Sequence, residues 1–152
     1  MLIIGIGNEY RSDDAAGLIA ARRLRKILPQ SVTILEQSGE GTALMDAWNN
    51  SAEVIVLDAV SSGKPAGVIH RFAAHAEPVP AVFLRHSTHA FSLAEAVELG
   101  RVLEQLPERL IVIGIEGKNF QSGTALSPEV EAAVDRLVAE ELAAFHNEQG
   151  KH

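Results

Sequence analysis

The sequence predicts an α/β protein with three layers (αβα), in which a twisted, mostly parallel sheet of about five strands lies between helices. Short β-branched runs alternate along the chain with segments whose apolar residues recur at helical spacing. The runs 54–60 and 110–115 are apolar almost throughout, as strands buried on both faces are. The chain is 47% hydrophobic but only 5% aromatic, so its core has to consist mainly of Ala, Val, Ile and Leu. This composition suits helices packed on strands.

The first half of the chain is expected to hold three parallel strands and two helices. A compact apolar run ends near Gly7 and predicts the first strand. Helical spacing follows from Asp13 onward, and Pro29 ends that helix. The expected elements are strand 2–6, helix 13–28, strand 32–35, helix 41–48 and strand 54–60.

The second half is expected to add two strands and two helices. Residues 67–72 alternate in polarity and predict an antiparallel strand at the sheet edge. Ser92 and Glu95 form a capping-box pattern at the start of a helix that runs to about residue 102. Strand 110–115 comes next, and a last helix begins after Ser127 and ends near Phe145. We therefore expect one domain over residues 1–146 and a frayed tail over 147–152.

Composition excludes several classes of function. With 20 acidic and 13 basic residues the formal charge is −7, which opposes binding to nucleic acid or to an anionic membrane surface. The absence of cysteine excludes disulfides, thiolate metal sites and a cysteine nucleophile. The chain begins MLIIGIGNE, without a basic leader, and no apolar run reaches the ~18 residues of a membrane span. The expectation is a cytoplasmic protein.

The stretch GIGNEYRSDDAAG at residues 5–17 raises the question of a dinucleotide site, because two glycines follow the first strand. That fingerprint needs a third glycine at the position of Tyr10. Acids at the start of the helix would also repel a pyrophosphate. The stretch therefore does not predict a nucleotide pocket.

Three acids stand where ligands bind in such sheets, outside the carboxyl ends of the strands. Asp13 is suited to capping the following helix, and Asp14 can then project into the cleft above the sheet. Asp58 lies where a central strand ends; the alternative role is a carboxylate hydrogen-bonded to loop amides. Two carboxylates brought together without a cation would raise the pKa of one of them, and a divalent metal removes that conflict.

The segment 85–89 supplies imidazoles close to a loop-to-helix junction. A histidine in such a place can also be solvated or cap the helix. Two carboxylates and one imidazole with open positions suit Zn, Ni or Fe better than Ca or Mg. His86 and His89 are both candidate ligands at this point, and His86 lies three residues further from the helix.

Several motifs together resemble the hydrogenase maturation proteases in order and spacing. They are GIGN at 5–8, SDDAAG at 12–17, VIVLDAV at 54–60, STHA at 87–90, IGIEGKNFQSG at 113–123 and LSPEV at 126–130. The resemblance implies an endopeptidase that removes a C-terminal extension from the large-subunit precursor of [NiFe] hydrogenase after nickel insertion.

The resemblance also implies roles for particular residues. The metal-contacting side chains fall on Asp14, Asp58 and His89, and the metal is nickel carried by cysteines of the precursor, although Zn or Cd could occupy the same ligands. One of the two carboxylates, or a metal-polarised water, is the nucleophile or general base. The protein is expected to be a monomer that binds metal only through its substrate.

Four further residues belong to the candidate site, Asn8 as a catalytic residue and Gly39, Gly41 and His86 as substrate-binding residues. Asn8 either orients Asp14, donates to the substrate carbonyl or simply serves a turn. Gly39 and Gly41 give the second loop the backbone freedom to accept an extended peptide, and His86 is grouped with them as a substrate-binding residue.

Two rival functions stay open on the sequence. A peptidyl-tRNA hydrolase also begins with a strand and a Gly-x-Gly-Asn turn, but the charge of −7 and the lack of a basic stripe oppose it. A chaperone that holds the precursor without cutting it is the other, and the acids at positions 14 and 58 favour catalysis over it.

Overall fold

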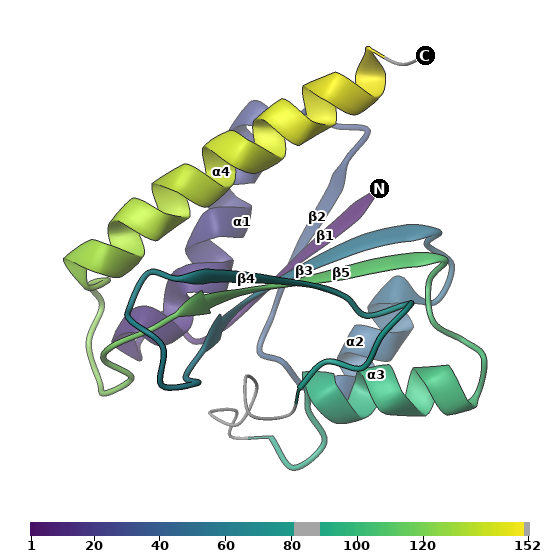
Figure 1. Cartoon of the computed structure of the whole chain (residues 1–152), viewed down its shortest axis with the longest axis horizontal. Coiled ribbons are helices and arrows are strands. Elements are labelled where there is room, and N and C mark those ends of the chain that lie inside the picture. The colour runs from purple at the N-terminus through teal and green to yellow at the C-terminus, as the bar shows by residue number, and fades with distance from the viewer. Residues whose placement is uncertain (81–88, 151–152) are drawn as a thin grey trace.

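A five-stranded sheet forms the middle layer of the protein, whose computed structural model describes residues 1–80 and 89–150 (Figure 1). The strand order is β2-β1-β3-β5-β4, and only β4 runs antiparallel to its neighbour. The strands are β1 (Leu2–Ile6), β2 (Thr33–Gln37), β3 (Glu53–Val60), β4 (Ile69–Ala73) and β5 (Arg109–Glu116). The expected fold class, with its antiparallel edge strand, is confirmed.

Helices cover both faces of this sheet. Helices α1 and α4 pack on one face, and α2 and α3 pack on the other (Figure 1). The helices are η1, a 3₁₀ turn (Ser12–Ala15), α1 (Ala16–Ile27), α2 (Gly41–Trp48), α3 (Leu93–Val102) and α4 (Pro128–Gln149). No helix in the described ranges is long and apolar enough to span a membrane.

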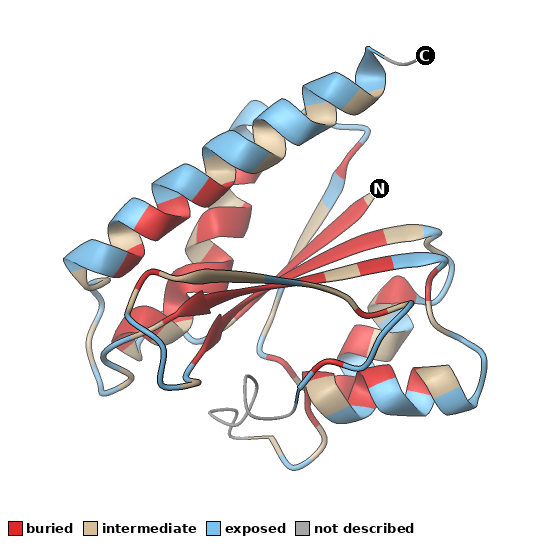
Figure 2. Ribbon diagram, in the orientation of Figure 1, coloured by how far each residue is buried: buried red, intermediate tan, exposed pale blue. Residues whose placement is uncertain are grey.

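The central strand β3 shows why the apolar runs are continuous. Val54 and Val56 face the α2/α3 layer, whereas Ile55 and Leu57 face the α1/α4 layer. All of these side chains are buried, and the middle of the sheet is buried along its length (Figure 2). Because successive side chains of a strand point to opposite faces, a strand covered on both faces is apolar at every position.

Helix α1 can lie close to the sheet because of Gly17. A Cβ atom at this position would collide with the carbonyl oxygen of Leu57 and would stand 2.6 Å from that of Ile6. The glycine that lets a helix approach the sheet is therefore at position 17, within the helix, and not at position 10, where a dinucleotide fingerprint needs it.

Two helix boundaries differ from the sequence-based expectation. Helix α1 begins at Ala16, because Asp13 and its neighbours form the η1 turn instead of the first helical turn. Helix α4 continues past Phe145 to Gln149, so residues 147–149, expected in a frayed tail, are helical. An ion pair of 3.1 Å between Arg109 Nη1 and Glu148 Oε1 ties this last stretch to β5.

Candidate active-site cleft

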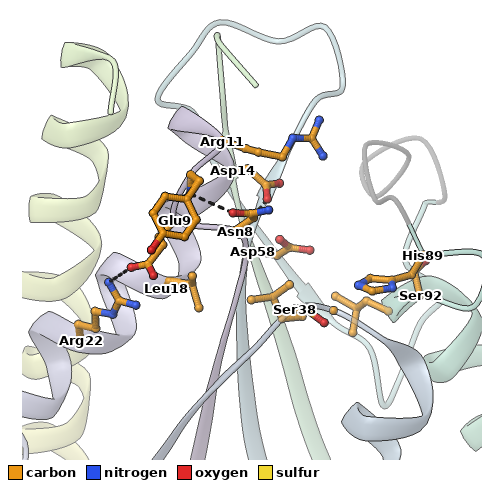
Figure 3. A pocket seen from close by; sticks show the side chains of 15 residues that line it. Asn8, Glu9, Arg11, Asp14, Leu18, Arg22, Ser38, Asp58, His89 and Ser92 are labelled. Carbon is orange, nitrogen blue, oxygen red and sulfur yellow. Dashed lines mark hydrogen bonds and ion pairs between the residues drawn. The ribbon is translucent and has the colours of Figure 1, made fainter. Parts of the chain in front are cut away.

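A cleft of about 400 Å³ opens at the carboxyl end of the parallel strands (Figure 3). Its walls come from the loop after β1, from η1 and α1, from the loop after β2, from the end of β3 and from the residues before α3. The side chains used below are those of Asn8, Glu9, Arg11, Asp14, Arg22, Asp58 and His89. We refer to this hollow as the cleft.

Asp14 enters the cleft from η1, and the backbone of Asn8 holds its carboxylate. The Asn8 N–H donates to Asp14 Oδ2 at 2.9 Å. The Asn8 side chain accepts from the Tyr10 N–H, also at 2.9 Å, which closes an Asx turn. The structure thus gives Asn8 two of the roles considered above, orientation of Asp14 through its main chain and support of a turn through its side chain.

Asp58 enters the cleft from the end of β3 and is only 6% exposed. The N–H of Ala59 donates to its Oδ1 at 2.8 Å. One carboxylate oxygen of Asp14 and one of Asp58 therefore each accept a hydrogen bond from a main-chain N–H, which helps to orient the two carboxylates.

His89 lines the cleft from the side of α3, and its ring points toward the two carboxylates (Figure 3). The three predicted ligands, which are far apart in the sequence, thus meet around one cavity. Within residues 1–80 and 89–150, however, no three His, Asp or Glu side chains are close enough together to hold an ion by themselves. The chain brings the predicted ligands to one place without closing them into a finished metal site.

The three residues assigned to substrate binding lie in different surroundings. Gly39 lines the cleft with φ +101°, and a Cβ there would stand 2.9 Å from Ile6 Cγ2 and 3.9 Å from the His89 ring. Gly41 is buried outside the cleft at the start of α2, where its N–H donates to the Phe91 carbonyl at 2.8 Å. His86 lies outside the described residues.

Asp13 points away from the cleft and does not cap α1, so that expectation was wrong. Its Oδ2 accepts from the N–H groups of Lys118 and Asn119 at 2.8 and 2.9 Å. The Ser127 N–H donates to Oδ1 at 2.7 Å and the Ser127 hydroxyl to Oδ2 at 2.8 Å. Asp13 therefore fastens η1 to the loop after β5 and to the start of α4.

The buried surroundings of Asp13 also set its protonation state. Burial alone would raise the pKa of this carboxyl, but the hydrogen bonds from Ser127, Asn119 and Lys118 outweigh it and leave the pKa below its ordinary value. Asp13 is thus held as a carboxylate that accepts hydrogen bonds, and it has no access to a ligand in the cleft.

Sequence reasoning missed the basic residues of the cleft. Asp14, Leu18 and Arg22 all line it, and their four-residue spacing is the signal that could have placed Arg22 beside Asp14. Arg22 pairs with Glu9 at 3.2 Å and with Glu36 at 2.8 Å. Side-chain hydrogen bonds from Arg22 and Arg25 hold the pKa of Glu36 below its ordinary value.

The fold and the cleft together indicate a hydrolase rather than a nucleotide-binding protein. Two oriented carboxylates and an imidazole around a cavity are groups that activate water or bind a metal that does so. The turn after β1 also has Tyr10 where the fingerprint of a pyrophosphate site needs a third glycine.

Comparison with known proteins identifies the particular family. The family model described as hydrogenase maturation protease matches residues 19–144. The hydrogenase 2 maturation protease of Escherichia coli strain K12 is 31% identical over 149 residues, covering 95% of this chain and 90% of that protein. The hydrogenase expression/formation protein HupD of Thiocapsa roseopersicina is 26% identical over 151 residues, covering 95% of this chain and 68% of that protein.

Solved structures give the same result. The solution structure of an endopeptidase from Escherichia coli superposes with a TM-score of 0.81 at 28% identity, covering 97% of this chain and 92% of that one. The [NiFe] hydrogenase maturation protease HybD of Thermococcus kodakarensis gives a TM-score of 0.66 at 29% identity, covering 93% of this chain and 97% of that one. The chain belongs to the hydrogenase maturation proteases, which are endopeptidase hydrolases. The resemblance seen in the sequence is confirmed, and the peptidyl-tRNA hydrolase reading is set aside.

Proposed function

We propose that this protein removes the C-terminal extension of a [NiFe] hydrogenase large-subunit precursor after nickel has been inserted. The observation that supports this most is the meeting of Asp14, Asp58 and His89 around one cleft, although they come from η1, β3 and the segment before α3. The nickel is cargo of the precursor, where cysteines hold it, and the three side chains engage it as the precursor enters the cleft.

The shared metal explains why the three side chains do not need to form a closed site of their own. Carboxylate oxygens and an imidazole nitrogen are suitable ligands for nickel, and precursor thiolates complete its coordination. Each carboxylate is already oriented by a main-chain N–H, from Asn8 for Asp14 and from Ala59 for Asp58. A precursor without nickel offers these groups no cation, so it is held less tightly and its scissile bond is not placed. Zn or Cd could occupy the same ligands.

Hydrolysis itself needs a base and a water molecule. In one alternative Asp14 or Asp58 is the base, which removes a proton from the water that attacks the scissile carbonyl carbon. In the other, a water polarised by the metal is the nucleophile. Asn8, Gly39, Gly41 and His86 are proposed to contact the peptide or to shape the loops that receive it. The proposal also includes a monomeric enzyme that acts in the cytoplasm, without nucleic acid or membrane as a partner.

Nickel-loaded and nickel-free precursor, each incubated with the purified protein, provide the test. Mass spectrometry should detect release of the C-terminal peptide from the loaded form only. Equal cutting of both forms would contradict recognition through nickel. Stable binding without any cutting would select the non-catalytic chaperone instead.

Single variants test the site in the same assay. Asp14→Ala, Asp58→Ala and His89→Ala should each abolish processing, while Asp46→Ala, on the exposed side of α2, should process normally. Thermal unfolding of each variant separates loss of function from loss of fold. A His89 variant that cuts at the normal rate would show that the assignment of the site is wrong.

A further inference from the structure

Among the described residues that line the cleft, Arg11 has a charged side chain without an ion-pair partner. Arg11 and Arg22 are the arginines among the described residues that line the cleft, and Arg22 is paired with Glu9 and with Glu36. Arg11 makes no ion pair with any residue in the ranges 1–80 and 89–150. Among the described residues, the positive charge of Arg11 therefore lies in a cleft lined by acids without a carboxylate partner of its own.

The position of Arg11 is fixed on several sides. Its N–H donates to the Asn8 carbonyl at 3.2 Å, and its own carbonyl accepts from the Asp14 N–H at 3.1 Å. Its backbone also forms a bridge with Gly123. In the side chain, Nε donates to the Phe120 carbonyl at 3.3 Å. These bonds hold both the main chain and the plane of the guanidinium.

The two terminal amino groups of Arg11 are the part left for a ligand. They make no hydrogen bond to a residue that the structure describes. Figure 3 shows the guanidinium on the same side of the cleft as the Asp14 carboxylate. A guanidinium carries its N–H donors in a planar fork and keeps its charge at every physiological pH. Arg11 is thus an anchored donor beside one of the acids of the site.

Peptide hydrolysis creates a need for such a donor. When the water oxygen adds to the scissile carbonyl carbon, the carbonyl oxygen takes up a negative charge. The proton of the water passes to the base, the carbon–nitrogen bond then breaks, and the proton is delivered to the leaving amine. Asp14 and Asp58 carry like charge to the developing oxyanion, and a guanidinium close to them would offset that repulsion.

We propose that Arg11 is a catalytic residue that stabilises the oxyanion formed on the scissile carbonyl of the precursor. This inference rests on the proposed endopeptidase function. The guanidinium acts mainly on the transition state, because the charge that it meets exists only there. Loss of Arg11 should accordingly lower kcat much more than it raises KM.

The test compares Arg11→Gln with Arg25→Gln, which removes the same charge from an exposed position on α1 outside the cleft. With nickel-loaded precursor, Arg11→Gln should lose a factor of about 100–1,000 in kcat with KM changed by less than about threefold. Arg25→Gln should stay close to the unaltered protein. The unaltered protein is assayed first, so its failure to cut would refute the proposed function, whereas normal cutting by Arg11→Gln would refute only the role of Arg11.

Chemical rescue separates catalysis from a structural role. Arg11→Gly with millimolar guanidinium added should recover part of the lost kcat, since the free ion can occupy the vacated space. Thermal unfolding establishes that the variant is folded under the same conditions. A kcat within about threefold of normal, a change confined to KM, or a folded variant that guanidinium does not rescue would each overturn the proposal.

Discussion

Asp13 and Asp14 are neighbours in the sequence, but they lie on opposite sides of η1 and belong to different parts of the molecule. Asp13 is fully buried and accepts hydrogen bonds from Lys118, Asn119 and Ser127. Asp14 is partly exposed and lines the cleft, where the Asn8 N–H orients it. The comparison teaches that one acid fixes the turn and thereby places the other.

The different roles of Asp13 and Asp14 follow from the geometry of the η1 turn. In η1 the side chains of consecutive residues diverge, so only one of the pair can reach the loop after β5 while the other faces the cavity. Because Asp13 is locked at several points, the backbone of Asp14 has a defined place over the sheet. A change at Asp14 should therefore mainly lower activity, whereas a change at Asp13 should mainly lower stability.

The largest expected effect is on catalysis, from Asp14→Asn. We expect the rate of precursor processing to fall by at least about 100-fold, because the amide can neither act as a base nor bind a cation as a carboxylate does. The melting temperature should change little, since the Asn8 N–H can still donate to the amide oxygen. Single-turnover assays and thermal unfolding measure the two quantities. A processing rate near normal would remove Asp14 from the site.

The next largest effect is on stability, from Asp13→Ala. This change leaves the N–H groups of Lys118, Asn119 and Ser127 without the carboxylate that accepts from them. A hydrogen bond to a charged group contributes about 1.5–3 kcal/mol, and water can replace part of the lost acceptor, so we expect the free energy of unfolding to fall by about 3 kcal/mol in total. Urea unfolding measures it. An unchanged urea midpoint would show that the hydrogen bonds to Asp13 are not needed for stability, and Asp13 and Asp14 would then not differ in the way described.

The stabilisation by Asp13 should also depend on pH in a defined direction. The pKa of Asp13 is lowered in the folded protein, so its contribution is complete above the unfolded value of 3.8. It is lost as the pH falls through the folded-state pKa, because the folded protein must then protonate a group that it prefers ionised. The difference in unfolding free energy between the unaltered protein and Asp13→Asn should shrink from pH 6 toward pH 3. A difference in unfolding free energy that grows as the pH falls would contradict the stabilising role of the Asp13 carboxylate.

The smallest expected effect comes from Glu36→Gln. The pKa of Glu36 is also lowered, first by side-chain hydrogen bonds from Arg22 and then from Arg25. This carboxylate is on the surface, where solvent screens the ion pairs, so we expect a loss of only about 0.5 kcal/mol. Urea unfolding of Glu36→Gln and of Asp13→Ala under the same conditions compares an exposed and a buried acid whose pKa values shift in the same direction. A loss as large as that of Asp13→Ala would show that burial is not what distinguishes them.

The sequence predicted the fold well because its strand segments are clear apolar runs and its helix segments have apolar residues at clear helical spacing. The buried run at 54–60 and the capping box of Ser92 and Glu95 appear in the structure as β3 and the start of α3. The end of α4 was not predicted, because a contact between Arg109 and Glu148, distant in the sequence, supports its last turn. Boundaries that depend on tertiary contacts leave no local pattern.

The candidate site was predicted in part. The sequence placed Asp14, Asp58 and His89 at one edge of the sheet, and all three line the cleft. The sequence could not show that Asp13 faces inward, since its partners come more than 100 residues later. Arg11 was missed for a similar reason, because its anchor is the carbonyl of Phe120 in the loop after β5.

The central claim, that the cleft recognises the precursor through its nickel, is tested most directly by binding affinity. Isothermal titration calorimetry on ice-cold samples would give Kd for nickel-loaded and nickel-free precursor, with the unaltered protein and with His89→Gln. We predict that the unaltered protein binds the loaded precursor at least about tenfold more tightly, a difference of about 1.4 kcal/mol, and that His89→Gln loses most of this preference. Equal affinities of the unaltered protein for the two precursors would contradict the account.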